Sequence, residues 1–253
     1  ADDFEAYGAS IAAAGKSKVV VDNVTIDNVG AVCTAVDAVE KSDVLVMNSH
    51  IRTKGLDPDT CWADAMTEVP WVLGLKGSVR STNVCDEAHA TYYNCDMVSN
   101  GWGVLSTDDI SEGAMHDIVN TRAVIEKDGI FDSGYVVYVL GKSRTKMFGV
   151  EMSSPDYPIT FGGNTHDIYI GSSARENLIR YLGTDSLLAR ETNGYADIAP
   201  RTTKLHGDCY ALMWHHVCTG KVTVEDAELS GDRCVFLIKA IEGNMFGKVM
   251  PPS

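Results

Sequence analysis

The sequence predicts an α+β fold built of two similar sheet-rich lobes with a few short helices. Three observations support this prediction: strand-like runs outnumber helical segments, two stretches of the chain resemble each other, and the composition is that of a globular protein. The apolar fraction is 45% and the charged fraction 22%, both ordinary for a folded domain. A chain of 253 residues is long enough to bury a substantial core.

Three segments are expected to be helical. The Ala-rich stretch Asp2–Ala14 is acidic in its first turn and is followed by a glycine, as short helices often are. Asp57-Pro58 predicts a helix to about Met66, with Asp as N-cap and Pro as the first helical residue. Ser173-Ala-Arg-Glu176 has the spacing of a capping box, and its helix is expected to end near Gly183.

The remaining regular segments are rich in β-branched and aromatic residues, which favour strands. The predicted strands are Lys18–Ile26, Asp43–Met47, Trp71–Leu75, Tyr135–Leu140, Asp167–Ile170, Tyr210–Val217 and Arg233–Ile238.

An internal similarity suggests a duplication. Lys146-Met-Phe-Gly149 recurs 98 residues later as Asn244-Met-Phe-Gly247, and ten of 38 positions are identical when 115–152 is laid on 213–250. Chance alone gives roughly two or three identities at average composition. The duplication predicts a first lobe at 55–152 and a second at 153–253, with an N-terminal helix and strands at 1–54 packing on both. Phe148 and Phe246 are expected to anchor the core in at least one copy.

Charge and cysteine content restrict the partners and the compartment. The net charge is −14 and the pI about 4.8, so nucleic acid and anionic lipid surfaces are improbable partners. The sequence contains no run of 18 apolar residues, so it predicts no membrane-spanning helix. The chain has seven cysteines, begins with Ala and shows no leader. We expect mostly free, buried thiols in a reducing compartment, and either a removed Met or a removed targeting peptide.

One segment holds five residues of the types that bind zinc. They are His206, Cys209, His215, His216 and Cys218. Their spacing matches no common zinc loop, and on a strand Cys209 and His215 would face away from His216 and Cys218. The corresponding positions of the first copy hold no such set. We therefore predict no metal.

No other cluster carries a complete catalytic pattern. A helix from about Asp86 would place Cys85 and His89 one turn apart, with Cys95 nearby, but no orienting group or oxyanion hole is recognisable. Gly101-Trp-Gly103 lacks the third glycine of a dinucleotide site. Phe161-Gly-Gly163 lacks a phosphate-binding Lys, and Thr165-His-Asp167 is an isolated triplet. The sequence thus predicts no enzyme, no cofactor, and no catalytic, cofactor-binding or metal-binding residue.

The two function hypotheses are a self-associating structural protein and a small Cys/His-dependent, possibly zinc-dependent, enzyme. The two copies share apolar strands and the Met-Phe-Gly turn, but they share no set of polar residues that could form a site. This favours assembly, because a surface that occurs twice in one chain can bind neighbouring molecules at several symmetry-related positions. In this tandem architecture, over about residues 55 to 253, the chain resembles the pyrenoid shell proteins of diatoms. That resemblance implies a homo-oligomeric lattice around Rubisco in the chloroplast stroma. A viral coat or tube protein would share the same features.

Overall fold

The computed structural model describes residues 9–30, 32–56, 78–101, 103–108, 111–127, 134–155, 157–161, 164–215, 218–239, 243–245 and 248–250. Strands make up 61% and helices 7%. In the described part, neither helix is long and apolar enough to cross a membrane.

Most strands belong to three parallel sheets. The first sheet, in spatial order, is β1 (Ile11–Ala13), β4 (Val32–Ala38), β7 (Ser78–Val84), β10 (Gly103–Thr107), β13 (Tyr135–Val139), β16 (Tyr157–Phe161), β19 (Tyr210–His215) and β22 (Cys234–Lys239). The second sheet is β2 (Lys18–Asp22), β5 (Asp43–Met47), β8 (His89–Tyr93), β11 (Glu112–Val119), β14 (Lys142–Phe148), β17 (Asn164–Gly171) and β20 (Cys218–Val224). The third sheet is β3 (Thr25–Gly30), β6 (His50–Gly55), β9 (Asp96–Ser99), β12 (Arg122–Ile125), β15 (Glu151–Ser154), β18 (Thr203–Gly207) and β21 (Ala227–Gly231). A small antiparallel pair, β23 (Gly243–Met245) and β24 (Lys248–Met250), lies apart from them.

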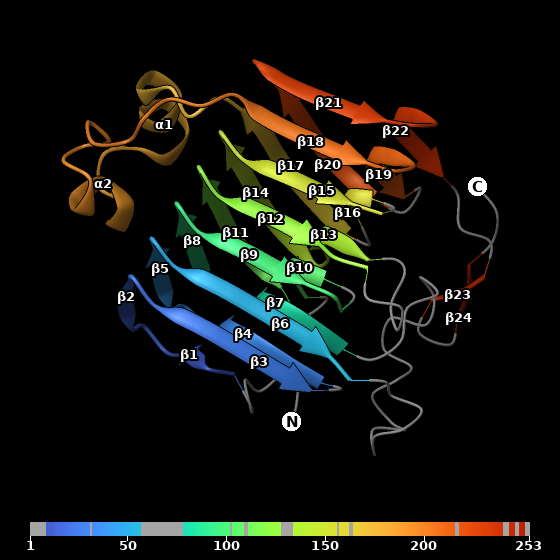
Figure 1. Ribbon diagram of the computed structural model, residues 1–253, viewed down its shortest axis with the longest axis horizontal. Coiled ribbons are helices and arrows are strands. Elements are labelled where there is room, and N and C mark those ends of the chain that lie inside the picture. Colours follow the sequence, from blue (N-terminus) through green and yellow to red (C-terminus); the bar gives the residue numbers. More distant parts are fainter. Residues whose placement is uncertain are drawn as a thin grey trace.

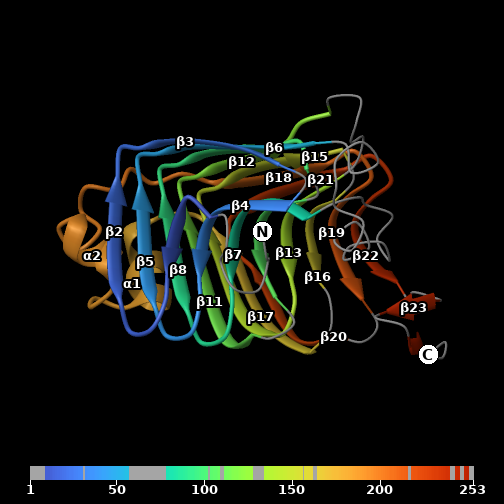
Figure 2. The ribbon, with the colours of Figure 1, turned by 90° about the horizontal axis from the view of Figure 1, so that it is seen from below.

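The chain visits the three sheets in turn, so that each strand pairs in parallel with the strand three places later. This arrangement is a parallel β-helix, and β1 to β21 form seven coils (Figures 1 and 2). Residues that face each other in adjacent coils are 22 to 32 apart in sequence, as for Val137 and Ile159 or Leu105 and Val137. Two steps are longer, 46 from Val44 to Ala90 and 53 from Ile159 to Leu212, because they contain insertions.

The turn from the second sheet to the third repeats one backbone conformation. We call it the asparagine corner; its residues with φ between 47° and 61° are Asn23, Asn48, Asn94, Asn120, Gly149 and Asp226. Asn, Asp and Gly tolerate this left-handed conformation best. Two of these side chains are also joined by a hydrogen bond: Asn94 Nδ2 donates to Asn48 Oδ1 at 2.7 Å. Asn48 Nδ2 in turn donates to the Asp22 carboxylate at 2.8 Å.

The interior of the coil is filled mainly by aliphatic side chains from all three sheets. Fully buried examples are Val44, Ile51, Met97, Leu105, Ile118, Val137, Met147 and Met152. Because every coil adds apolar residues to one continuous core, the stacking itself stabilises the fold.

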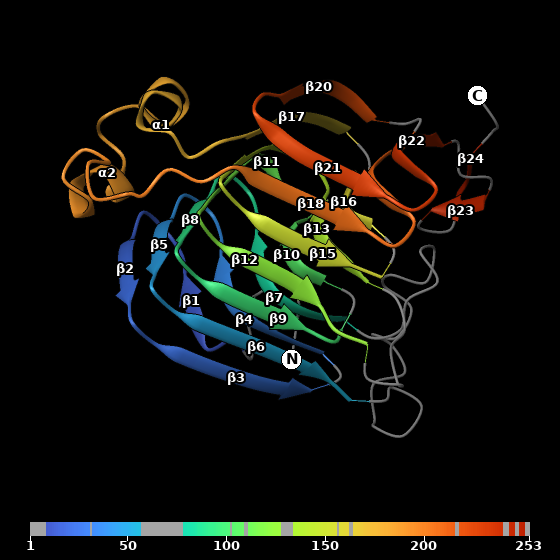
Figure 3. The same cartoon turned by 45° about the horizontal axis from the view of Figure 1, so that its top comes forward.

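A helical insertion interrupts the sixth coil between β17 and β18. It contains α1 (Arg175–Leu182) and α2 (Leu187–Glu191) and lies beside the coil, not at its end (Figures 1 and 3). Phe148 and Tyr169 of the second sheet form a buried cluster with Leu178, Leu188 and Tyr195 of the insertion. The insertion therefore covers the outer face of the second sheet.

The structure contradicts the predicted α+β fold with two lobes. Met115 lies in β11 of the second sheet, whereas its supposed counterpart Met213 lies in β19 of the first. The Met-Phe-Gly similarity thus joins segments that occupy different places in the coil. The predicted segments 1–54, 55–152 and 153–253 meet at residues 54/55 and 152/153. Each of the three parallel sheets contains strands from both sides of these two boundaries.

Most predicted strands in the described part are confirmed, although Lys18–Ile26 divides into β2 and β3 at Asn23. The helix near Ser173 is confirmed and ends at Gly183, but Ala174 is its N-cap and makes no side-chain cap bond. The predicted helix at 2–14 is wrong where it is described, because residues 11–13 form β1. The helix at 57–66, the strand at 71–75 and Phe246 lie outside the described residues.

Candidate functional site

A polar cleft of about 960 Å³ lies where the insertion returns to the coil. It is bounded by the asparagine corner, by the adjoining end of the third sheet and by the segment that leads into β18. Its lining residues are Asn48, His50, Asn94, Cys95, Asp96, Asn120, Thr121, Arg122, Gly149, Val150, Glu151, Arg201, Thr202, Lys204 and Glu228. We call it the corner cleft.

The insertion forms one wall of the corner cleft and is tied to the coil by hydrogen bonds. Asn120 Nδ2 donates to the Ala199 carbonyl at 2.7 Å. The backbone N–H of Arg201 donates to Ser173 Oγ at 2.8 Å, and that of Ser173 donates to the Arg201 carbonyl at 2.9 Å. Both ends of the insertion are therefore joined to each other and to the asparagine corner.

Gly149 makes this closure possible. It has φ +61°, and a Cβ there would lie 2.5 Å from Asn120 Oδ1 and 2.6 Å from Ser173 Oγ. An asparagine, the residue that four earlier coils use at this corner, cannot fit under the insertion. The change from Asn to Gly therefore marks the coil on which the insertion closes.

The floor of the corner cleft is a row of charged residues, one from each successive coil of the third sheet. In register order these residues are His50, Asp96, Arg122, Glu151, Lys204 and Glu228. From Asp96 onward, acidic and basic residues alternate, which places opposite charges side by side on neighbouring strands.

Three neighbouring pairs in this row lie within ion-pair distance, and the longest joins His50 Nδ1 and Asp96 Oδ2 at 3.8 Å. Arg122 Nη1 lies 2.7 Å from Asp96 Oδ1, and Lys204 Nζ lies 3.4 Å from Glu228 Oε2. Glu151 lies in register between Arg122 and Lys204, yet within the described residues its carboxylate has neither a hydrogen bond nor an ion pair. The middle of the row is therefore the place where an acceptor is open to a ligand.

The cleft differs from the rest of the protein in its charge balance. Arg122, Arg201 and Lys204 offset its three carboxylates, whereas the whole chain carries −14. The lining contains amides and hydroxyls but no Phe, Tyr or Trp side chain. Such a surface can form many hydrogen bonds with a polar ligand without selecting strongly for either sign of charge.

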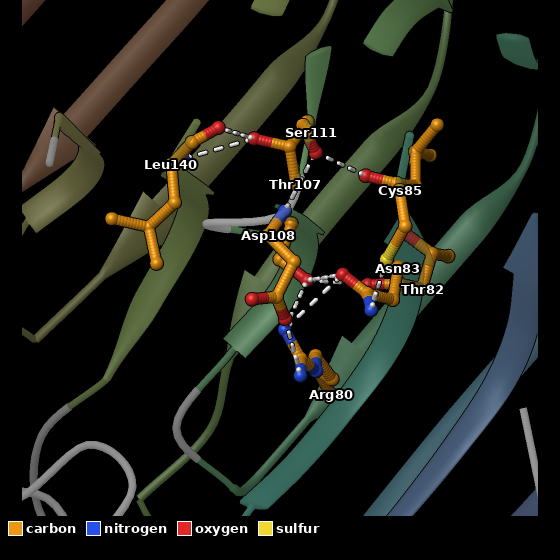
Figure 4. A network of polar contacts seen from close by, with 10 residues as sticks. Arg80, Thr82, Asn83, Cys85, Thr107, Asp108, Ser111 and Leu140 are labelled. Atoms are coloured by element: carbon orange, nitrogen blue, oxygen red, sulfur yellow. Dashed lines mark hydrogen bonds and ion pairs between the residues drawn. The ribbon is translucent and has the colours of Figure 1, made fainter. Parts of the chain in front are cut away.

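The structure does not place Cys85 and His89 on one helix. Asp86 has φ +54° and turns the chain between the first and second sheets. Cys85 accepts a hydrogen bond from Asn83 Nδ2 at 3.1 Å, beside the buried Arg80–Asp108 ion pair of 3.1 Å (Figure 4). Burial raises the pKa of Cys85 far above its ordinary value, so the thiol stays protonated and unreactive.

His89 instead lies between two carboxylates on the outer face of the second sheet. Its Nε2 is 2.7 Å from Asp117 and its Nδ1 is 3.2 Å from Asp43. Burial alone would lower the pKa of His89, but the hydrogen bonds to Asp117 and Asp43 raise it to about 9. Both nitrogens are occupied, so the imidazolium acts as an ionic link. Cys95, the third residue of the predicted cluster, belongs to the corner cleft, and burial raises its pKa to about 11.

The five residues considered as zinc ligands are only partly described. His206 hydrogen-bonds with Ser230 Oγ at 2.9 Å, while the side chains of His215 and His216 lie outside the described residues. Among the described residues, no group of three or more His, Cys, Asp or Glu side chains is arranged to hold a metal ion. The absence of metal stays a prediction.

The glycine motifs and the isolated triplet have structural positions. Gly103 begins β10 and Phe161 ends β16, while residues 102, 162 and 163 lie outside the described part. In the triplet, Thr165 hydrogen-bonds with Thr219 at 3.0 Å and the buried His166 with Ser143 at 2.9 Å. Four of the six described cysteines, Cys33, Cys85, Cys95 and Cys218, are buried.

Sequence reasoning missed the corner cleft entirely. A signal was present, because an apolar run followed by Asn and a small or polar pair occurs as Asn23-Val-Thr, Asn48-Ser-His, Asn94-Cys-Asp and Asn120-Thr-Arg. The first residue of each unit belongs to the asparagine corner, and the third residue of the last three units, His50, Asp96 and Arg122, belongs to the charged row. No family model, curated protein or solved structure matches the chain.

Proposed function

We propose that the protein binds an extended, polyhydroxylated polymer, a glycan chain, in the corner cleft. The observation that carries this proposal is the shape and chemistry of the floor: one charged or hydrogen-bonding side chain per coil, from His50 to Glu228. A hydroxyl-rich chain offers donors and acceptors at every unit, as such a row requires.

The direction of the cleft supports a polymer over a compact small molecule. Adjacent coils of a parallel sheet are about 4.8 Å apart, so the six-residue row extends for about 24 Å along the axis. A sugar unit is similar in length to the spacing of the coils. Successive units could therefore meet successive side chains.

The charge balance argues against polyanions. Three cationic and three anionic side chains line the cleft beside His50, and the chain as a whole is strongly acidic, so a nucleic acid backbone would be repelled. A neutral glycan avoids this repulsion and can accept from Arg122 and Arg201 while donating to Glu151.

Affinity electrophoresis through gels containing neutral or acidic polysaccharides tests the proposal. We expect retardation by at least one neutral polysaccharide, and Glu151→Gln should weaken it because the amide replaces a charged acceptor. Glu112→Gln is the matched control, since Glu112 is exposed at the start of β11, outside the cleft. Unchanged mobility in all neutral gels, or equal loss in both variants, would refute glycan binding at this site.

A second candidate function is self-association. In β22, the last strand of the first sheet, Val235, Phe236 and Ile238 are 44%, 42% and 69% exposed. Among the described strands β22 pairs only with β19, and an edge strand with exposed apolar residues favours association. Light scattering over a range of protein concentrations tests it: a constant monomer mass in the wild type and in Ile238→Lys contradicts assembly. The pyrenoid location and the Rubisco partner stay predictions from the resemblance.

A further inference from the structure

A second pocket, of about 200 Å³, shares no lining residue with the corner cleft. It is formed by the outer face of the second sheet and by α1. Its lining residues are Arg144, Lys146, Asp167, Ile168, Tyr169, Tyr181, Lys221 and Thr223. Three of these residues are cationic and one is anionic, in a chain whose net charge is −14.

Lys146 is the buried cation of this pocket. Its side chain is only 11% exposed, donates a hydrogen bond to the Tyr181 carbonyl, and lies 3.9 Å from Asp117 Oδ1. Burial lowers the pKa of Lys146, and Arg144 lowers it further, against the opposing effect of Asp117. A negative charge brought into the pocket would therefore be stabilised.

The carboxylate nearest Lys146 is already engaged elsewhere. Asp117 Oδ2 lies 2.7 Å from His89, and Asp117 Oδ1 has no hydrogen-bond partner in the described part. At 3.9 Å the contact with Lys146 is too long for a hydrogen bond. The ammonium is thus compensated only partly by the protein.

The tyrosines form an uncharged wall. The rings of Tyr169 and Tyr181 are in contact, with centroids 3.8 Å apart and planes tilted by 32°. Both hydroxyls donate to Glu225 Oε2, at 3.4 Å and 3.3 Å. Because Glu225 occupies the hydroxyls, the charged groups left to the pocket are Arg144, Lys146 and Lys221 and one carboxylate, Asp167. Asp167 lies in register between Arg144 and Lys221, so the lining keeps a net charge of +2.

We infer that this pocket binds one compact oxyanion, a phosphate, sulfate or carboxylate group. Its volume of about 200 Å³ is large enough for one such group together with bound water. The guanidinium of Arg144 and the ammonium groups of Lys146 and Lys221 line the pocket and outnumber its one carboxylate, so they can supply charge-assisted hydrogen bonds to such a group.

Isothermal titration calorimetry at low ionic strength, with inorganic phosphate, sulfate and acetate as separate probes, tests this inference. We expect saturable 1:1 binding of at least one probe, and the strongest probe identifies the class of oxyanion. Backbone amide NMR shifts at residues 144–147 and 221–223 should locate the binding. The double variant Arg144→Gln/Lys221→Gln should weaken it at least about tenfold, the usual effect of losing charged hydrogen bonds. Both side chains are exposed, so the variant is expected to fold.

Lys18→Gln is the matched control, because Lys18 is exposed in β2 of the same sheet, far from the pocket along it. Unchanged binding in this control supports a local site. Equal weakening in the control and the double variant would show a general surface effect and overturn the inference, as would the absence of binding by all three probes. The corner cleft is untouched by these substitutions, so the outcome is independent of glycan binding.

Discussion

Phe148 provides a sharp test of how the insertion is held. Its side chain is fully buried, with its ring centroid 5.0 Å from that of Tyr169 and 6.3 Å from that of Tyr181. It belongs to the cluster beneath the insertion, whereas its neighbour Met147, equally buried, belongs to the interior of the coil. The predicted role of Phe148 as a buried anchor therefore holds, but the anchor lies outside the coil.

Truncation of the two neighbours should have different consequences. Phe148→Ala is expected to cost about 3–5 kcal/mol, and Met147→Ala about 2–5 kcal/mol. For Phe148→Ala, this cost reduces the free energy with which the insertion docks on the second sheet. At 1.4 kcal/mol per tenfold change, the undocked population rises by about two to three and a half orders of magnitude. For Met147→Ala, the cost reduces the free energy of unfolding of the whole coil.

Limited trypsin digestion and hydrogen exchange separate these outcomes. Arg180 and Arg190 are exposed in the insertion, and Phe148→Ala should speed cleavage there under conditions where the coil strands remain protected. Met147→Ala should lower the melting temperature of the coil and expose both regions together. If the two variants show the same pattern of cleavage and exchange, the insertion is not a separately docked unit and the reasoning is wrong.

Three further predictions follow from the geometry. Gly149→Ala should lower the melting temperature and loosen residues 172–202 in hydrogen exchange, because its Cβ would meet Asn120 and Ser173; an unchanged melting curve would contradict the proposed close approach. His89 has a folded-state pKa of about 9, above its ordinary 6.5, so its stabilising effect is complete below pH 6.5 and is lost as the pH rises through 9. Denaturant titrations should show that His89→Gln removes this decline, and a persistent decline would assign it to other groups. Elemental analysis after dialysis against a weak chelator should find no stoichiometric zinc, and one zinc per chain would revive the enzyme hypothesis.

The strands were predictable and their arrangement was not. Runs such as Asp43–Met47 and Tyr135–Leu140 have enough β-branched and aromatic residues to be recognised locally, and both form strands. Their neighbours in space are about one coil away in sequence, and insertions lengthen two of these steps to 46 and 53 residues. A repeat of 22 to 32 residues interrupted in this way gives no constant period to detect.

The offset of 98 residues also has a structural explanation. The register along the first sheet leads from Val137 through Ile159 and Leu212 to Phe236, a distance of 236 − 137 = 99 residues. The gapless alignment instead placed Val137 on Val235. An error of one residue in a strand exchanges its two faces. The sequence similarity therefore arose because the coils share apolar residues, and it did not align the residues that pair in the sheet.

The candidate site escaped prediction for a different reason: its residues are individually ordinary. Asp96, Arg122 and Glu151 are surface charges with no local motif, and only the stacking of coils brings them into one row. The feature that could have located them is the asparagine that precedes each by two residues, replaced by Gly149 in the fifth coil. That replacement coincides with the closing of the insertion over the corner. In a solenoid, an insertion is tolerated at a turn because the ladders on both sides can continue, and it can build a wall that the uniform coil lacks. The cleft, its floor of alternating charge and the open Glu151 carboxylate all follow from this one departure from the repeat.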